Sequence, residues 1–241
     1  MEFAIIIPAR YKSSRFPGKP LAMIKGTPLI KRVWDICINA VPKEQVFVAT
    51  DDNRIQKYCI DNNMNVLLTS ESCLTGTDRV YEASLQIDAD LYINVQGDEP
   101  TLNPRDISLI ASQATNADVV NAMCSITNES DFMNPNVPKV VTRLDGKLLY
   151  MSRAGVPSNK TSKFVSAMKQ VCIYAFSKKA LHDFYHNGKK TPLEEIEDIE
   201  ILRFLELGYD VHMVKVSSSS LAVDIPEDIL KVEEYLNSKN P

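Results

Sequence analysis

Short apolar runs alternate with amphipathic segments over the first half of the chain. Residues 3–7 form a continuous apolar run, which is typical of a strand that is covered on both faces. Apolar residues then recur at helical spacing over 29–37. The same pattern predicts strands at 45–50, 66–69 and 90–96 and a helix at 54–63. Strand and helix in alternation predict an α/β fold with a doubly wound, mostly parallel sheet.

The pattern changes at about residue 118. Further strands are expected at 119–123, 139–144 and 169–176, with Asp145-Gly146 marking a hairpin-like turn and a polar loop over 156–168. These strands predict a small accessory sheet layer, covering about 118–190. Because no linker or internal repeat interrupts the chain, we expect residues 1–241 to form a single domain.

The last fifty residues carry clear helix signals. Thr191 is expected to cap a helix that begins at Pro192, is rich in acidic residues and ends at Gly208. A strand is predicted at 211–216. Residues 221–224 read as another strand, which ends in Asp224, and the last helix follows it.

Composition limits the class of protein. Apolar residues make up 44% and charged residues 24% of the chain, as in ordinary globular proteins. The net charge is −4, which gives no sign of a general surface for nucleic acid or anionic membranes. No apolar run approaches the roughly 18 residues of a membrane span, and the first residues lack the pattern of a signal peptide. We therefore expect a cytoplasmic protein.

The cysteines and histidines give no metal pattern. Five cysteines contain no C-x-x-C pair, so we expect them to be reduced and mostly buried. His182 and His186 are four residues apart, but no H-E-x-x-H sequence surrounds them. A zinc site is not expected.

A cationic loop follows the first strand, with Pro17-Gly18 forcing a turn near its end. Open α/β sheets bind ligands at the carboxyl ends of their strands, so these cations face the expected site. Backbone N–H groups and basic side chains together suit a polyphosphate, although a merely solvated basic loop is the alternative. The spacing is neither that of a P-loop nor G-x-G-x-x-G. The cations are Arg10, Lys12, Arg15 and Lys19.

Two aspartates end predicted strands later in the chain. Asp98 follows the strand at 90–96 and lies between Gly97 and a turn that ends in Pro100, a position that suits a Mg²⁺ ligand on a triphosphate. The alternative is that Asp98 caps the helix beginning near Asn103. Asp224 is the second such aspartate. Thr77 is expected to cap the helix after residue 76, where Gly76 allows close approach to a ligand.

Five ordered segments resemble the nucleotide-sugar pyrophosphorylases, and more narrowly the CMP-Kdo synthetases (3-deoxy-manno-octulosonate cytidylyltransferases). The match spans nearly the whole chain, so its five parts together are much more specific than any one of them. The segments are Pro8-Ala9-Arg10 with Ser13-Ser14-Arg15 and Pro17-Gly18-Lys19-Pro20, Ala49-Thr50-Asp51-Asp52, Gly76-Thr77-Asp78-Arg79, Val95-Gln96-Gly97-Asp98-Glu99-Pro100, and Val223-Asp224-Ile225-Pro226-Glu227-Asp228.

The resemblance implies Mg²⁺-dependent transfer of CMP from CTP to the anomeric hydroxyl of Kdo or a related ulosonic acid, with release of pyrophosphate. It implies a homodimer whose interface lies in the accessory region. The implied catalytic residues are Lys19, Arg10, Arg15 and Asp98, and the implied metal ligands are Asp98 and Asp224. The implied nucleotide-binding residues are Pro8, Ala9, Arg10, Lys19, Thr75, Gly76, Arg79 and Gln96.

The acceptor region departs from the family pattern. The family usually has Arg-His-Ile-Gly-Ile-Tyr where this chain has Lys169-Gln170-Val171-Cys172-Ile173-Tyr174. A neutral amide in place of histidine favours an ulosonic acid other than Kdo, but Gln170 could equally replace the histidine's hydrogen bond. The implied sugar-binding residues are Arg153, Gln170, Tyr174, Glu194 and Glu197.

Two other functions stay open. One is a nucleotidyltransferase for a different acceptor acid or an alcohol phosphate. The other is a catalytically silent nucleotide-binding regulator, although a silent protein has no need of Lys19, Asp98 and Asp224 together. The sequence does not name the acceptor.

Overall fold

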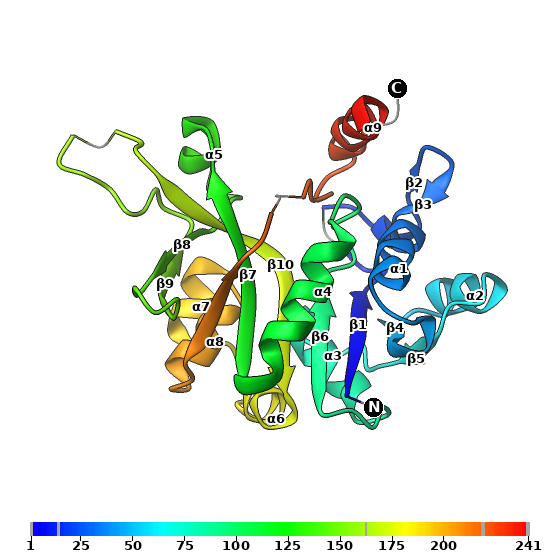
Figure 1. The fold of residues 1–241 in the computed structure, drawn as a ribbon. Coiled ribbons are helices and arrows are strands. Elements are labelled where there is room, and N and C mark those ends of the chain that lie inside the picture. Colours follow the sequence, from blue (N-terminus) through cyan, green and yellow to red (C-terminus); the bar gives the residue numbers. More distant parts are fainter. Residues whose placement is uncertain (1, 14, 162, 218–219, 240–241) are drawn as a thin grey trace.

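One sheet of nine strands runs through the described part of the chain, and helices cover both of its faces (Figure 1). The structure is a computed structural model, and it describes residues 2–13, 15–161, 163–217 and 220–239. The main path of the sheet has the order β11-β7-β10-β6-β1-β4-β5. These strands are β1 (Phe3–Ala9), β4 (Val46–Thr50), β5 (Val66–Leu68), β6 (Leu91–Val95), β7 (Val119–Ile126), β10 (Ala167–Ser177) and β11 (Val211–Lys215).

The centre of the sheet is parallel. Strand β1 pairs in parallel with both β4 and β6, so that Ile5 lies opposite Val46 on one side and Ile93 on the other. Strand β10 is antiparallel to β6 and β7, whereas β11 is parallel to β7. The expected α/β fold with a mostly parallel sheet is confirmed. Because β1, β4 and β6 run the same way, the loops that follow them meet at one edge.

Each face of the sheet has its own apolar core. On one face, α1, α2 and α4 pack through residues such as Val33, Ile55 and Ile107, all of which are fully buried. On the other face, α3, α6 and α8 pack through residues such as Val80 and Phe204. The helices are α1 (Leu29–Ala40), α2 (Asn53–Asp61), α3 (Gly76–Ser84), α4 (Pro104–Gln113), α5 (Glu129–Met133), α6 (Lys178–His186), α7 (Pro192–Glu197), α8 (Ile201–Glu206) and α9 (Asp228–Lys239).

The strands expected in an accessory layer divide between two places. Strands β7 and β10 lie within the main sheet, where they continue it beyond β6. The pair β8 (Lys139–Thr142) and β9 (Leu148–Ser152) forms the small accessory part, a hairpin that branches from β10. Its turn contains Asp145-Gly146, as predicted, with Gly146 at a φ of 84°. A separate two-stranded sheet is formed by β2 (Met23–Ile24) and β3 (Thr27–Pro28).

The single helix expected after Thr191 is wrong, because the structure has two helices there, α7 and α8. The chain leaves α7 at Asp198, which has a left-handed φ of 50°. The break lets two acids bind different elements: Glu197 accepts a hydrogen bond from the Arg153 N–H in the segment after β9, and Glu200 accepts one from the Thr77 N–H in α3. In a continuous helix these acids would lie on one face.

Two local predictions also need correction. Residues 221–224 are not a strand; the Val223 N–H donates to the Asp98 carbonyl at 2.9 Å, which ties this segment to the site. The cap of α3 is Thr75 rather than Thr77, since the Asp78 N–H donates to the Thr75 hydroxyl and the Thr75 N–H donates to the Asp78 carboxylate. Among the described helices, none has the length and apolar character needed to cross a membrane.

Candidate active site

The cationic loop folds back on itself after β1. Strand β1 ends at Ala9, and Gly18, which has a φ of 74°, donates its N–H to the Tyr11 carbonyl at 2.9 Å. A side chain at Gly18 would meet the Tyr11 ring at 3.0 Å, so both the backbone conformation and the space favour glycine. Lys19 follows directly and begins a short 3₁₀ helix, Lys19–Leu21. The turn at Pro17-Gly18 thus fixes the backbone from which Lys19 extends.

Lys19 lies between the two predicted metal ligands. Its Nζ donates to the Asp98 carboxylate at 2.8 Å and lies 3.9 Å from the Asp224 carboxylate. The same Nζ donates to the Val223 carbonyl at 2.8 Å, and Arg15 contacts Asp224 at 3.1 Å. The Lys19 side chain is only 17% exposed. The structure therefore brings together two carboxylates and two cations from three distant parts of the sequence.

A close backbone contact sets the position of Asp98. A Cβ added at Gly97 would lie 2.8 Å from the carbonyl oxygen of Pro8, so only glycine fits there without moving β1 away from β6. Pro8 and Ala9 are buried at the end of β1, whereas Arg10, the next residue, is exposed. The end of β1 and the turn after β6 are consequently in direct contact, which places Asp98 next to the end of β1.

Helix α3 brings its amino end against the residue after β6. A Cβ at Gly76 would lie 2.9 Å from the amide of Gln96, so these two predicted nucleotide-binding residues are neighbours. Thr75 caps the helix. Arg79 is buried; its guanidinium donates to the Thr69 hydroxyl at 2.5 Å and lies 3.4 Å from Asp51. Arg79 thus fixes the loop after β5 in place.

A buried acid, Glu99, follows the predicted metal ligand Asp98 directly in the sequence. Burial raises the pKa of Glu99 to about 8, so its carboxyl is mainly neutral at pH 7. Its Oε2 is buried and has no hydrogen-bond partner among the described residues. Burial also raises the pKa values of the neighbouring Cys172 thiol and Tyr174 hydroxyl well above normal. Tyr174, a predicted sugar-binding residue, is therefore a neutral, mostly buried group at this site.

The predicted acceptor residues Arg153 and Glu197 bind each other. The Glu197 carboxylate accepts hydrogen bonds from the Arg153 N–H at 2.8 Å, from the Ser152 hydroxyl at 2.7 Å and from the Tyr150 hydroxyl at 3.2 Å. Burial opposes ionisation, but these hydrogen bonds outweigh it and lower the pKa of Glu197. The Arg153 guanidinium donates to the carbonyls of Pro135 and Glu197, among others, which holds its charge in a fixed place.

Glu194 has a different environment from the other predicted sugar-binding residues. Its carboxylate is fully buried and accepts two hydrogen bonds of 2.6 Å from Arg203, whose side chain is also buried. The same carboxylate accepts from the Thr191 N–H. The geometry makes Glu194 part of a buried ion pair with Arg203.

Three site residues had no assigned role in the sequence prediction: Glu99, Glu200 and Asn121. Glu200 joins α8 to the start of α3 by accepting from the Gly76 and Thr77 N–H groups. Asn121 is fully buried in β7 and receives a hydrogen bond from Gln170. The only signal for Asn121 in the sequence is a polar residue inside an apolar strand.

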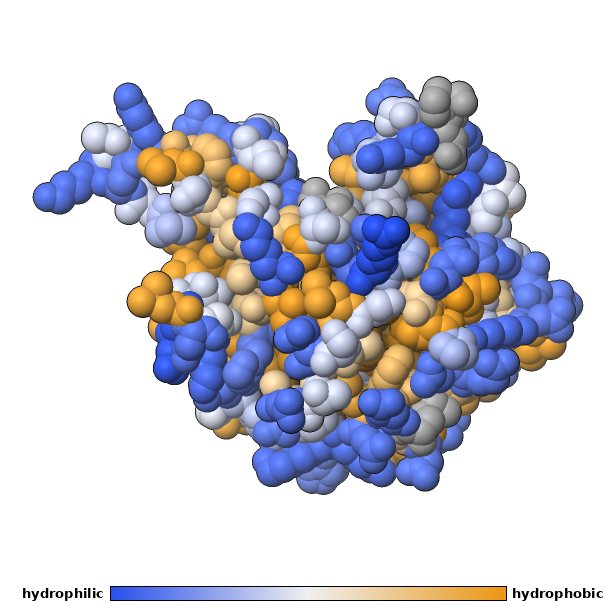
Figure 2. All heavy atoms as spheres, viewed as in Figure 1, coloured by the Kyte–Doolittle hydropathy of each residue, from blue (hydrophilic) through white to orange (hydrophobic). Residues whose placement is uncertain are grey.

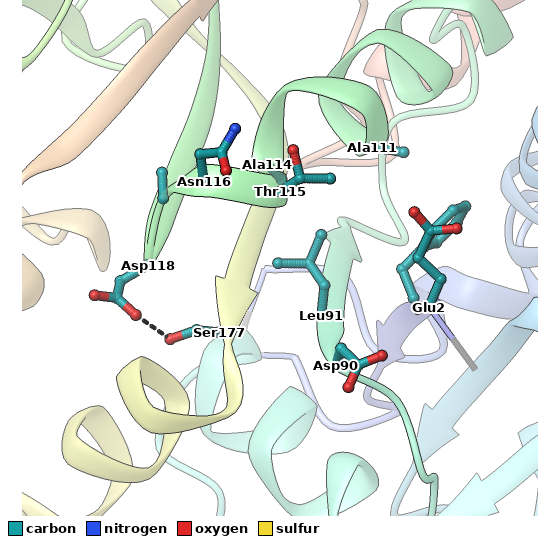
Figure 3. Close-up of a pocket in the computed structure, with 11 residues that line it drawn as sticks. Glu2, Asp90, Leu91, Ala111, Ala114, Thr115, Asn116, Asp118 and Ser177 are labelled. Atoms are coloured by element: carbon teal, nitrogen blue, oxygen red, sulfur yellow. Dashed lines mark hydrogen bonds between the residues drawn. The ribbon is translucent and has the colours of Figure 1, made fainter.

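A half-open pocket of about 360 Å³ lies away from this site. It is lined by residues at the start of β1 and β6, including Glu2, Asp90 and Leu91, and by Asp118 and Ser177, which share a hydrogen bond (Figure 3). Because β6 runs from Leu91 to Val95, this cavity lies at the opposite edge of the sheet from Asp98. Its charged lining residues are acidic, which does not suit an anionic nucleotide.

The cationic site is open rather than enclosed. Figure 2 shows that the face in view is hollowed between the part that carries α5 and the part that carries α9. No group of three or more His, Cys, Asp and Glu side chains in the described residues is placed to hold a metal ion by itself.

Comparison with known proteins agrees with this geometry. The cytidylyltransferase family profile matches residues 4–215, and the chain belongs to this family. Within the family, a 3-deoxy-manno-octulosonate cytidylyltransferase of Protochlamydia amoebophila is 40% identical over 98% of this chain and 94% of its own length. A mitochondrial protein of that name from Arabidopsis thaliana is 38% identical over 98% of this chain and 83% of its own length.

A solved structure supports the same relationship. The structure of a CMP:2-keto-3-deoxy-manno-octonic acid synthetase complexed with CTP superposes with a TM-score of 0.91 and 31% identity, covering 99% of this chain and 100% of that one. HddC from Yersinia pseudotuberculosis, with a TM-score of 0.70 and 17% identity, shares the fold. The resemblance to CMP-Kdo synthetases that the five motifs indicated is confirmed.

Proposed function

We propose that this protein transfers CMP from CTP to the anomeric hydroxyl of Kdo or a related ulosonic acid. In the reaction the anomeric oxygen forms a bond to the α-phosphorus, the bond from that phosphorus to the bridging oxygen breaks, and pyrophosphate leaves. The observation that carries the proposal is the placement of Lys19 within 4 Å of both Asp98 and Asp224, at the carboxyl edge of the sheet. The cytidylyltransferase family and the printed names of the full-length relatives support it.

The cations of the loop hold the triphosphate in this proposal. Lys19 and Arg15 now contact carboxylates, and a triphosphate offers them phosphate oxygens of higher charge instead. Arg10 is exposed at the end of β1 and adds a third positive charge. These groups stabilise the charge that develops on the leaving pyrophosphate, which is the main task of a protein in phosphoryl-type transfer.

The donor atoms at the site fit Mg²⁺. Asp98 and Asp224 supply carboxylate oxygens, which Mg²⁺ prefers, and both lie close to one ammonium group, so this position already accommodates a cation. When bound, Mg²⁺ would neutralise phosphate charge and polarise the phosphoryl oxygens. Two protein ligands are sufficient, because Mg²⁺ commonly completes its shell with substrate phosphate oxygens and water.

Nucleotide and acceptor lie on the two sides of Gln96 in this proposal. The nucleotide surface in this proposal consists of Pro8, Ala9, Thr75 and Gly76. Arg79 binds Thr69 in the loop after β5 and lies next to Asp51, and so holds this surface in position. On the acceptor side, Arg153 offers a fixed positive charge to the carboxylate of the sugar. Glu197 keeps Arg153 in place, with Tyr174 and Gln170 completing the surface.

The test is a substrate matrix with pyrophosphate as the readout. The protein is incubated with Mg²⁺, each of the four nucleoside triphosphates, and a panel of ulosonic acids, sugar phosphates and alcohol phosphates. We expect pyrophosphate only with CTP and an ulosonic acid. Release with an alcohol phosphate instead would indicate another nucleotidyltransferase, and CTP binding without any release would indicate a silent regulator.

We further propose that the protein is a homodimer, joined through β9 and α7. Leu149 in β9 is 56% exposed and Ile196 in α7 is 79% exposed, although the residues beside them, Tyr150 and Glu197, bind each other. Two apolar side chains on neighbouring elements suit a second copy of the chain. Light scattering should give twice the chain mass for the wild type and the monomer mass for the double variant Leu149→Asp, Ile196→Asp; a wild-type monomer would contradict this.

The cytoplasm is the proposed location. The described chain has five free cysteines, three of them buried, as is common in reducing compartments. Cell fractionation with an antibody to the chain tests this proposal. Recovery in a membrane or organelle fraction would contradict it.

A further inference from the structure

A fully buried asparagine on β7 controls the side chain that departs from the family pattern. Asn121 is 0% exposed, and its Nδ2 donates to the carbonyls of Val171 and Ile173 on β10, each at 3.0 Å. These carbonyls lie where the β7–β10 register shifts, from Val171 opposite Ala122 to Tyr174 opposite Asn121. The two N–H groups of Asn121 therefore both bind the backbone of the bulge.

This arrangement fixes the orientation of the Asn121 amide. An amide nitrogen has two hydrogens, and both are used by backbone carbonyls, which cannot donate in return. The Asn121 oxygen is thus the atom that faces Gln170, and it can only accept. Gln170 must present its Nε2 there, and the Nε2–Oδ1 distance is 3.0 Å.

The orientation of Gln170 follows from that of Asn121. With Nε2 directed at Asn121, the carbonyl oxygen Oε1 lies at the other side of the amide, and no hydrogen bond to it occurs among the described residues. Gln170 is half-buried on the sheet face that also carries Cys172 and Tyr174, and the Gln96 N–H donates to the Cys172 carbonyl on the same strand at 3.2 Å. A free amide would rotate and offer either atom, whereas this one offers an acceptor.

We infer that Asn121 is a positioning residue that makes Gln170 select a hydrogen-bond donor, a hydroxyl, on the acceptor sugar. This inference rests on the proposed function. A histidine at position 170 that gave one N–H to Asn121 would offer the sugar an acceptor nitrogen when neutral and an N–H donor when charged, whereas the Asn121–Gln170 pair offers an acceptor at every pH. A site built around one hydrogen bond rejects a ligand that cannot complete it.

Acceptor analogues test the polarity of this contact. Each sugar hydroxyl other than the reacting anomeric one is replaced in turn by hydrogen, which makes no hydrogen bond, or by fluorine, which accepts weakly but cannot donate. At one position we expect both analogues to lower kcat/KM about tenfold for the wild type, which is the usual value of one hydrogen bond. For Gln170→Met we expect both analogues to leave kcat/KM almost unchanged at that position. A fluoro analogue that performs as well as the parent at every position would overturn the inference.

A double-mutant cycle tests the role of Asn121. Asn121→Ala should raise the acceptor KM about tenfold with the KM for CTP unchanged, and the same substitution in a Gln170→Met background should add no further increase. Cys124→Ala, a buried truncation on the opposite face of β7, is the control for general loss of stability and should leave the acceptor KM unchanged.

The outcomes separate this inference from the proposed function. If no ulosonic acid gives pyrophosphate with the wild type, the proposed function fails and the cycle is not reached. If the wild type turns over but Asn121→Ala raises the acceptor KM equally in both backgrounds, or raises both KM values alike, the positioning role of Asn121 is wrong. If Asn121→Ala does not fold, the analogue series with Gln170→Met decides.

Discussion

Glu194→Ala should destabilise the protein without weakening acceptor binding. The Glu194 and Arg203 side chains are each 1% exposed, and the two hydrogen bonds between them are 2.6 Å long. Removing one member of a buried pair leaves an uncompensated charge and costs about 3–5 kcal/mol. Arg203 keeps a second buried carboxylate, that of Asp78, at 3.4 Å, together with the Phe184 carbonyl at 3.1 Å and the face of the Phe184 ring at 3.6 Å, so we expect the lower end, about 3 kcal/mol.

That loss is large enough to measure by thermal unfolding. For a chain of this length each kcal/mol lowers Tm by about 2–4 °C, which gives a fall of about 6–12 °C. Glu195→Ala, which removes an exposed acid from the next position of α7, is the matched control and should move Tm by at most about 2 °C. Steady-state assays below Tm should give an unchanged acceptor KM. A stable Glu194→Ala variant with a raised acceptor KM would refute this reasoning and would indicate that Glu194 binds the acceptor sugar.

Two further predictions concern the loop and its neighbouring strand. Lys19→Ala should raise the KM for CTP and lower kcat far more than Lys12→Ala, because Lys19 donates to Asp98 while the exposed Lys12 contacts only Glu71 among the described residues. Equal effects of the two variants in a pyrophosphate assay would show that the loop is only a general basic patch. Gly97→Ala should lower the free energy of unfolding in urea by about 1–3 kcal/mol and weaken CTP binding in calorimetry, since its Cβ would lie 2.8 Å from the Pro8 carbonyl. Wild-type values for both measurements would show that β6 can move away from β1 without cost.

The sequence was sufficient to predict that the loop after β1 and the turn after β6 lie together. Each of its motifs follows a short apolar strand, and parallel strands place their following loops at one edge of the sheet, so Lys19 and Asp98 had to meet. Asp224 lies next to Lys19, although the strand that was predicted to end in Asp224 is not formed. Its segment is held by the Val223 N–H bond to Asp98, the Leu221 N–H bond to Thr101 and a contact with Lys19, which no local pattern shows.

The acceptor side could not be predicted in the same way. Glu194, Glu197 and Glu200 occur in one acidic stretch with helical spacing, and nothing local distinguishes them. Their roles depend on partners outside this stretch: Glu194 forms a buried ion pair with Arg203, Glu197 accepts a hydrogen bond from β9, and Glu200 accepts one from α3. Asn121 depends likewise on a bulge in another strand, and a bulge leaves no clear mark in the apolar pattern.

Pyrophosphate release by Asp98→Asn and Asp224→Asn, at saturating CTP and Mg²⁺ with the best ulosonic acid, tests the central claim most directly. Each substitution removes a charged oxygen ligand with almost no change in volume, so Tm should stay close to that of the wild type. The account predicts that both variants fold and that each loses turnover by at least about a hundredfold, as expected when a group that stabilises transition-state charge is removed. Near-normal turnover in either folded variant would contradict the assignment of that aspartate to the metal.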